Sequence, residues 1–172
     1  MMDMVIRRAL QSDAAAIAEL IGQLNGRQPT VRDVELRLDF IEMSPIEELF
    51  VCEKAQKPEI REAESSGTGD NTDTPDDTKG PLLLGCMGFR LRENIEDLTR
   101  YGEVSMLVTN QAYRRQGVGR KLMEFAERMA EERGCIGTWL VSGTSREEAH
   151  RFYREMGYEI TGYRFVKRGT AK

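Results

Sequence analysis

Hydrophobic positions recur along the chain with two different periods, and the changes of period predict where its elements begin and end. Apolar residues spaced three and four apart predict amphipathic helices, whereas short β-branched or aromatic runs between turn-forming residues predict strands. The predicted elements are, in order, a strand at 4–10, a helix at 14–24 capped by Ser12 or Asp13, a helix at 30–43, strands at 48–55, 81–94 and 101–110, a helix after the turn at 114–119, a strand at 135–142, a helix at 145–158 with a capping box from Ser145 to Glu148, and a strand at 158–168.

This order, β-α-α-β-β-β-α-β-α-β, predicts one α/β (α+β) domain over 1–172 in which helices pack on a mixed central sheet. Gly85 and Gly88 inside the strand at 81–94 indicate a bulge or a close backbone approach. The segment 56–80 differs from the rest, with seven acidic against three basic residues and many Gly, Ser and Thr residues. It cannot bury enough apolar surface to offset its ordering entropy, so we expect a mobile inserted loop.

Composition narrows the class of protein. A chain of 172 residues with 40% hydrophobic residues suits one soluble domain, and its net charge of −4 disfavours nucleic-acid binding. No apolar run is long enough to span a membrane, and the N-terminus lacks a secretory signal, so we expect a cytoplasmic protein without a membrane partner. Cys52, Cys86 and Cys135 lack metal-ligand spacing and are expected to be reduced thiols, with no metal site.

The stretch AYRRQGVGRKLM, at 112–123, places glycines and arginines directly ahead of a helix. The backbone amides of Gln116 to Arg120 should be free at this helix N-terminus and converge on one point. The missing Cβ atoms of Gly117 and Gly119 would let an anion come close to the backbone. Arginines oppose the helix dipole here, so an anion is expected to offset Arg114, Arg115 and Arg120.

Two common nucleotide motifs do not account for this turn. A phosphate-binding loop of the GxxxxGK type is absent, and Leu122 occupies the third glycine position of a dinucleotide fingerprint. The helix that follows carries a plain apolar face that we assign to the core. A different phosphate ligand is therefore indicated.

The motif RRQGVG, at 114–119, resembles the Arg/Gln-x-x-Gly-x-Gly/Ala pyrophosphate turn of the GCN5-related N-acetyltransferases (GNAT superfamily). GEVSMLVTN before it resembles that family's preceding strand, and EEAHRFYREMGYE resembles its C-terminal Ala-x-x-Phe/Leu-Tyr-x-x-x-Gly-Phe/Tyr helix. The order of elements agrees over nearly the whole chain, except for the acidic insert. Within the superfamily, the cofactor half is most similar to small-amine, aminoalkylphosphonate-type N-acetyltransferases, and aminoglycoside acetyltransferases share some of these features.

The resemblance implies a GNAT fold with splayed middle strands and acetyl-CoA as cofactor. It implies that acetyl passes directly to a primary amine of a small molecule in a ternary complex. A protein or peptide N-acetyltransferase and a non-catalytic acyl-CoA-binding module are the alternatives. Many family members are dimers, so a homodimer is an expectation from the resemblance. The implied cofactor-binding residues are Leu107, Val108 and Thr109 for the pantetheine and Arg114, Arg115, Gln116, Gly117, Val118, Gly119 and Arg120 for the pyrophosphate.

Two residues are candidates for the proton transfers. An amine with a pKa of about 10 is mostly ammonium at neutral pH, so a base must take its proton. Glu103 matches the strand glutamate that serves histone-type family members, and period-2 alternation would place it on one face with Ser105 and Leu107. Tyr153 matches the family's helix tyrosine, which protonates the leaving thiolate. A backbone amide near Leu107 or Val108 would hold the oxyanion, and the alternative bases are Glu42, Glu47 and Glu48.

Other residues bear on binding. Arg146 stands where many family members carry an asparagine that contacts the cofactor, and it would instead meet a CoA phosphate. His150, the single histidine, makes no metal site and is expected to form a structural hydrogen bond or to be partly exposed. Trp139 is expected in the core. The sequence does not fix which amine is used, although basic side chains that suit a phosphonate or carboxylate are Arg27, Arg90 and Arg92.

Overall fold

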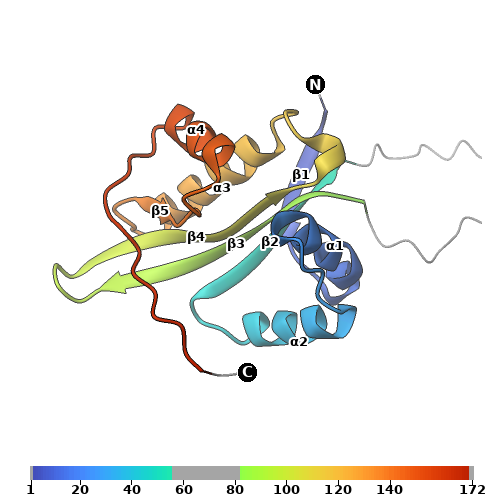
Figure 1. Ribbon diagram of the computed structural model, residues 1–172, viewed down its shortest axis with the longest axis horizontal. Helices are drawn as coiled ribbons and strands as arrows, with labels where there is room; N and C mark the ends of the chain where they lie inside the picture. Colours follow the sequence, from blue (N-terminus) through green and yellow to red (C-terminus); the bar gives the residue numbers. More distant parts are fainter. Residues whose placement is uncertain (1, 56–81, 171–172) are drawn as a thin grey trace, which may run out of the picture.

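The computed structural model describes residues 2–55 and 82–170, so the acidic segment predicted to be a mobile loop lies outside the described residues (Figure 1). The elements are β1 (Met4–Arg8), η1 (Gln11–Asp13), α1 (Ala14–Asn25), α2 (Val31–Glu42), β2 (Glu47–Lys54), β3 (Leu83–Asn94), β4 (Thr99–Thr109), η2 (Gln111–Tyr113), α3 (Val118–Glu132), β5 (Thr138–Leu140) and α4 (Glu147–Glu155).

A mixed five-stranded sheet carries helices on both faces, as predicted. The strands lie in sequence order, β1-β2-β3-β4-β5. Pairing is antiparallel from β1 to β4 and parallel between β4 and β5. Helices α1 and α2 cover one face, and α3 and α4 cover the other (Figure 1).

Each face of the sheet has its own hydrophobic cluster. On one face, α1 and α2 pack on apolar strand residues that include Val51, Cys86 and Val108. On the other, α3 packs on Phe50, Leu84, Met87, Phe89 and Val104. The middle of β3 is therefore buried on both sides and forms a platform that fixes the neighbouring β4.

A bulge at Ser105 interrupts β4. Gly88 pairs with Met106 and Phe89 pairs with Val104, so Ser105 has no partner on β3. A Cβ atom at Gly88 would displace the exposed Ser105 hydroxyl, whereas a Cβ atom at Gly85 would lie 2.8 Å from the backbone oxygen of Val108. The bulge shifts the alternation of β4, which places Leu107 against the α3 cluster and Met106 against the α1 cluster. The close backbone approach predicted from the glycines of β3 is confirmed.

The pairing between β4 and β5 covers three residues on each strand. Gly102, Glu103 and Val104 pair with Thr138, Trp139 and Leu140. Beyond Val104, β4 continues to Thr109 without a strand on its β5 side in the described part of the chain. β5 is the edge strand of the sheet and is shorter than the predicted strand at 135–142, so the predicted splaying of two middle strands is not seen among the described residues.

Two predictions about the C-terminal part are wrong. Residues 158–168 form no strand and are mostly exposed. In addition, Arg146 rather than Ser145 is the N-cap of α4, and no side chain caps that helix. The residue pattern of 158–168 is typical of a β-strand, but it does not specify the strand edge with which this segment would pair.

Asp13 is the N-cap of α1, but its side chain does not cap the helix. Its fully buried carboxylate accepts hydrogen bonds from Arg7 Nη1 at 2.7 Å, Arg7 Nη2 at 3.0 Å and the Leu10 amide at 2.8 Å. Arg7 also bonds Glu53 on β2 at 2.8 Å. The bidentate pair therefore ties the start of α1 to the edge of the sheet.

We predict that Arg7→Met lowers the free energy of unfolding by about 3–5 kcal/mol, because it leaves the buried Asp13 charge without its partner. Urea unfolding followed by circular dichroism measures the change. Arg32→Met is the matched control, since it breaks an exposed pair with Glu35 and should change stability little. Equal effects of the two substitutions would contradict the assigned role of Arg7.

Candidate functional site

The turn between β4 and α3 presents a run of unpaired backbone amides. Gly117 is the N-cap of α3 with φ 84° and ψ 0°, and Arg115 also has a positive φ of 61°. The first helical bond runs from the Lys121 amide to the Gly117 carbonyl at 2.9 Å. The amides of Gln116 to Arg120 donate to no acceptor among the described residues. This end of α3 can therefore bind an anion through its backbone.

The arginines of this turn differ in their partners. Arg115 pairs with Glu148 of α4 at 2.7 Å, and both side chains are exposed, so the pair contributes little to stability. Arg114 and Arg120 form no ion pair within residues 2–55 and 82–170. Their charge is available to an anionic group above the turn.

The two glycines of the turn have different roles. A Cβ atom at Gly117 would meet nothing within 4 Å, so the left-handed conformation alone explains this glycine. A Cβ atom at Gly119 would lie 3.4 Å from Thr109 Oγ1 and 3.6 Å from the Phe152 ring. Gly119 therefore lies where the end of β4, the start of α3 and α4 meet, and a Cβ atom there would make ordinary contacts, so the admission of an anion beside Gly119 stays a prediction.

Among the described residues, the edge of β4 that faces β5 is without a partner strand beyond Val104. Leu107 and Thr109 are half-buried and Val108 is buried, so their side chains are packed while the backbone edge that faces β5 has no strand beside it. Such an edge can pair with an extended amide-containing ligand. The edge leads directly to the turn before α3.

Tyr153 lies on α4 and packs on the α3 side of the sheet. Its ring lies 5.3 Å from the Phe152 ring and 6.1 Å from the Tyr158 ring, centroid to centroid. Burial raises the pKa of Tyr153 above its ordinary value, and the charge of Arg146 opposes this with a smaller effect. The phenol is therefore neutral, and in the described chain no hydrogen bond engages its hydroxyl.

Glu103 lies in a row of polar side chains that crosses four strands. The register aligns Glu47, Arg90, Glu103 and Trp139 on the face opposite to α3. Glu103 is 8% exposed, and its Oε2 accepts from Arg92 Nε at 2.5 Å and from Arg90 Nη1 at 3.5 Å. Arg90 also pairs with Glu47 at 2.7 Å. We call these residues, with Arg92, the polar row.

The position of Glu103 corrects one prediction. The bulge at Ser105 separates Glu103 from Leu107, which lie on opposite faces of the sheet. Glu103 and Tyr153 are likewise on opposite faces, and the structure does not bring them into contact.

Arg92 is a residue whose placement the sequence did not indicate. Its guanidinium carbon lies 5.9 Å from the Trp139 ring centroid, and its side chain is 45% exposed. Its Nε is bound to Glu103, while its Nη atoms form no ion pair with the described residues. Arg27, by contrast, is exposed in the loop after α1 and is absent from the polar row.

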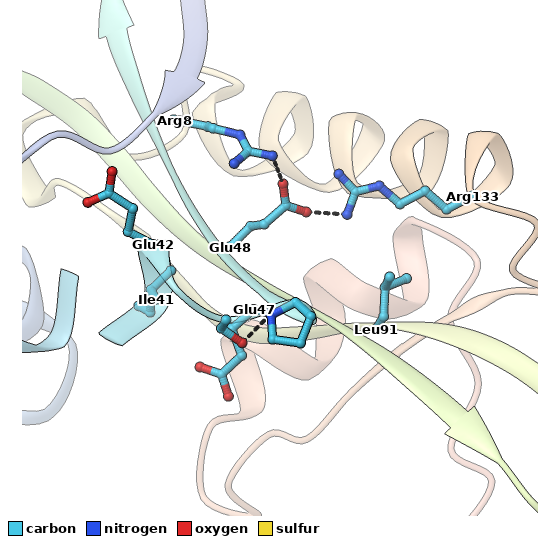
Figure 2. A pocket seen from close by; sticks show the side chains of 9 residues that line it. Arg8, Ile41, Glu42, Glu47, Glu48, Leu91 and Arg133 are labelled. Atoms are coloured by element: carbon cyan, nitrogen blue, oxygen red, sulfur yellow. Dashed lines mark hydrogen bonds and ion pairs between the residues drawn. The ribbon is translucent and has the colours of Figure 1, made fainter. Parts of the chain in front are cut away.

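The alternative bases lie around a cavity of about 260 Å³ between β2 and the end of α2 (Figure 2). Glu48 is held between Arg8 and Arg133 on the α3 side, much as Glu103 is held between Arg90 and Arg92. Glu42 lines the same cavity with an exposed side chain, and Glu47 joins this cavity to the polar row.

Arg146 and His150 lie at the start of α4. Arg146 occupies the N-cap, and its side chain lies near Gly143 and influences Tyr153. His150 bonds the Gly143 carbonyl through Nε2 at 2.8 Å, so the predicted structural hydrogen bond is confirmed. Trp139 is half-buried beside Arg92 rather than within the core.

The described residues contain no group of His, Cys, Asp and Glu side chains that could hold a metal ion. Cys52 and Cys86 are buried, Cys135 is half-buried, and all three are free thiols, as predicted. Burial raises the pKa of Cys86 to about 12. Within 2–55 and 82–170, no helix has the length and apolar content to cross a membrane.

The mixed five-stranded sheet with helices on both faces makes this an α/β protein, and the backbone amides at the start of α3 are free among the described residues. A sequence model described as "Acetyltransferase (GNAT) family" matches residues 37–158, and the chain belongs to this family.

Individual relatives agree with this assignment. The aminoalkylphosphonate N-acetyltransferase of Salmonella typhimurium is 31% identical over 85 residues, which cover 49% of this chain and 55% of that protein. An uncharacterized N-acetyltransferase of Bacillus subtilis is 38% identical over 65 residues, covering 37% of this chain and 46% of its own length. The chain thus spans about half the length of the curated relatives that it matches.

Solved structures share the fold over nearly the whole chain. A transcriptional regulator from Bacillus halodurans C-125 superposes with a TM-score of 0.74 at 18% identity, covering 96% of this chain and 99% of that one. The aminoglycoside N-acetyltransferase AAC(6')-Iy in complex with CoA gives a TM-score of 0.72 at 14% identity, covering 99% and 97%.

Proposed function

We propose that this protein transfers the acetyl group of acetyl-CoA to the primary amine of a small molecule. The observation that carries the proposal is the run of free amides from Gln116 to Arg120 beside the open edge of β4. The turn suits a pyrophosphate, and the edge from Leu107 to Thr109 suits the amides of a pantetheine arm. Arg114, Arg115 and Arg120 supply positive charge for the pyrophosphate, and Arg146, the N-cap residue of α4, would meet a CoA phosphate.

The chemistry requires three tasks of this chain. Acetyl-CoA supplies an activated thioester. A carbon–nitrogen bond forms between the acetyl carbon and the amine as the carbon–sulfur bond of the thioester breaks. Glu103 takes a proton from the acceptor ammonium, directly or through water. A backbone amide near Leu107 or Val108 stabilises the oxygen that gains negative charge. Tyr153 gives its proton to the departing sulfur.

The polar row favours an acceptor that carries an acidic group as well as an amine. Glu103 suits the ammonium, and the free Nη atoms of Arg92 suit a carboxylate or phosphonate. The relative named as an aminoalkylphosphonate N-acetyltransferase supports this choice.

We predict that Gly117→Ala weakens acetyl-CoA binding about tenfold, because a left-handed conformation costs an L-residue roughly 1–2 kcal/mol and the turn would relax away from it. Isothermal titration calorimetry measures the affinity. Gly134→Ala is the matched control, since Gly134 has φ 71° and open space but lies at the other end of α3. If the wild type gives no heat with acetyl-CoA, the proposed function is wrong.

We predict that Tyr153→Phe lowers kcat about 10²-fold. This is the low end of the rate contribution of general acids, because a thiolate already leaves well. The loss should be the same across pH 7 to about 9.5, since burial keeps the phenol protonated beyond the ordinary tyrosine pKa of about 10. Acetyl-CoA affinity should not change. Release of CoA thiol, followed with a panel of amines, provides the rate.

Tyr158→Phe is the control for this substitution. The Tyr158 hydroxyl donates to Glu127 at 2.9 Å and accepts from Thr138 at 2.7 Å, so its loss should reduce stability while kcat is retained. A wild-type kcat in Tyr153→Phe would remove Tyr153 from the mechanism. Tight CoA binding without turnover on any amine would indicate the non-catalytic module instead.

We predict that Arg92→Gln raises KM for 2-aminoethylphosphonate about tenfold or more. The reason is the loss of one hydrogen bond to a charged group, which contributes about 1.5–3 kcal/mol. Propylamine serves as the matched neutral acceptor. Any disturbance of Glu103 would affect both amines, so the ratio of their kcat/KM values isolates recognition of the acid. An unchanged ratio would show that Arg92 does not contact the acidic group.

A further inference from the structure

The first half of α4 lies beside the turn that precedes α3. A Cβ atom at Gly119, in the first turn of α3, would lie 3.6 Å from the Phe152 ring of α4. One helical turn before Phe152, the Glu148 carboxylate accepts a hydrogen bond from Arg115 Nη2 at 2.7 Å. The N-terminal end of each helix carries partial positive charge. Two positive helix ends and an arginine therefore share this region.

Glu148 offsets part of this positive charge. It lies in the first turn of α4 together with Glu147, where a negative side chain interacts favourably with the helix dipole. Of these two carboxylates, Glu148 alone forms an ion pair within residues 2–55 and 82–170. Glu148 is therefore the anion that the chain itself supplies to Arg115.

Arg115 has a second partner in the proposed function, on which this inference rests. There it supplies positive charge for the pyrophosphate, which also contacts the free amides from Gln116 to Arg120. A phosphate held by the same guanidinium would lie within a few ångströms of the Glu148 carboxylate, and like charges at such a distance repel each other. The carboxylate and the pyrophosphate are therefore alternative partners of Arg115.

We propose that Glu148 competes with the phosphates of CoA for Arg115 and thereby sets the affinity of the protein for its co-substrate. The side chains of Arg115 and Glu148 are 86% and 73% exposed, so their ion pair is weak and can be exchanged. The pyrophosphate carries more charge than one carboxylate and also binds the backbone amides, so it displaces Glu148. Acetyl-CoA and the product CoA carry the same phosphates. Glu148 therefore weakens the binding of both, and this favours release of the product.

Isothermal titration calorimetry with CoA on the full chain tests the proposal. Glu148→Gln keeps the size of the side chain and removes its charge, so CoA should bind about fivefold more tightly at low salt. In about 1 M sodium chloride the screening length falls to roughly 3 Å, and the gain in affinity should fall below about twofold. Thermal unfolding followed by circular dichroism checks that the variant is folded.

Glu147→Gln is the matched control. It removes the same charge from the same turn of α4 but breaks no ion pair among the described residues, so its CoA affinity should stay within about twofold of the wild type. Arg115→Gln provides a second comparison and should itself weaken CoA binding. When Glu148→Gln is added to Arg115→Gln, the gain should be less than about twofold, because no guanidinium then holds the carboxylate beside the phosphates.

The possible outcomes separate this competition from the proposed function. A wild type that gives no heat with CoA would overturn both. A wild type that binds CoA, with Glu148→Gln binding no more tightly than Glu147→Gln, would overturn the competition and leave the proposed function standing. A full gain from Glu148→Gln in the Arg115→Gln background would show that the carboxylate repels the phosphates without Arg115, which also overturns the competition.

Discussion

The short parallel ladder between β4 and β5 is the constraint on which the candidate site depends. It joins Gly102–Val104 to Thr138–Leu140 and then stops, while β4 runs on to Thr109. A longer ladder would satisfy the backbone groups of Leu107 to Thr109 and close the sheet. Because the ladder stops, a ligand can take the place of a strand, and the same stretch of β4 leads it to the free amides before α3.

The parts of the fold that the sequence predicted are those set by local chemistry. Helical periodicity located the four helices, and the glycines of β3 indicated the close approach that Gly88 makes to Ser105. The turn at 114–119 was predicted, because glycines directly ahead of an amphipathic pattern are a local signal, although the left-handed conformation of Gly117 was seen only in the structure. Its free amides follow from the helix start alone.

The parts that could not be predicted depend on pairing between distant strands. One unpaired residue at Ser105 moved Leu107 to the other face from Glu103, and no periodicity within β4 reveals a bulge. The arrangement of the polar row needs the register of four strands, so Arg90 and Arg92 appeared in the sequence only as available cations. The segment at 158–168 has strand-like residues, but its partner edge is not specified by its own sequence.

The opening of the sheet and the exposed C-terminal segment have a common physical origin. A strand of three residues makes few hydrogen bonds with β4, and its other edge is empty in the described chain. Lengthening the ladder on the β4 side would fill the cleft, so β5 can gain backbone partners only on its outer side. A strand added there would stabilise β5 without closing the opening. It would also fix Trp139, on which the Arg92 guanidinium rests, and Arg92 in turn binds the Glu103 carboxylate.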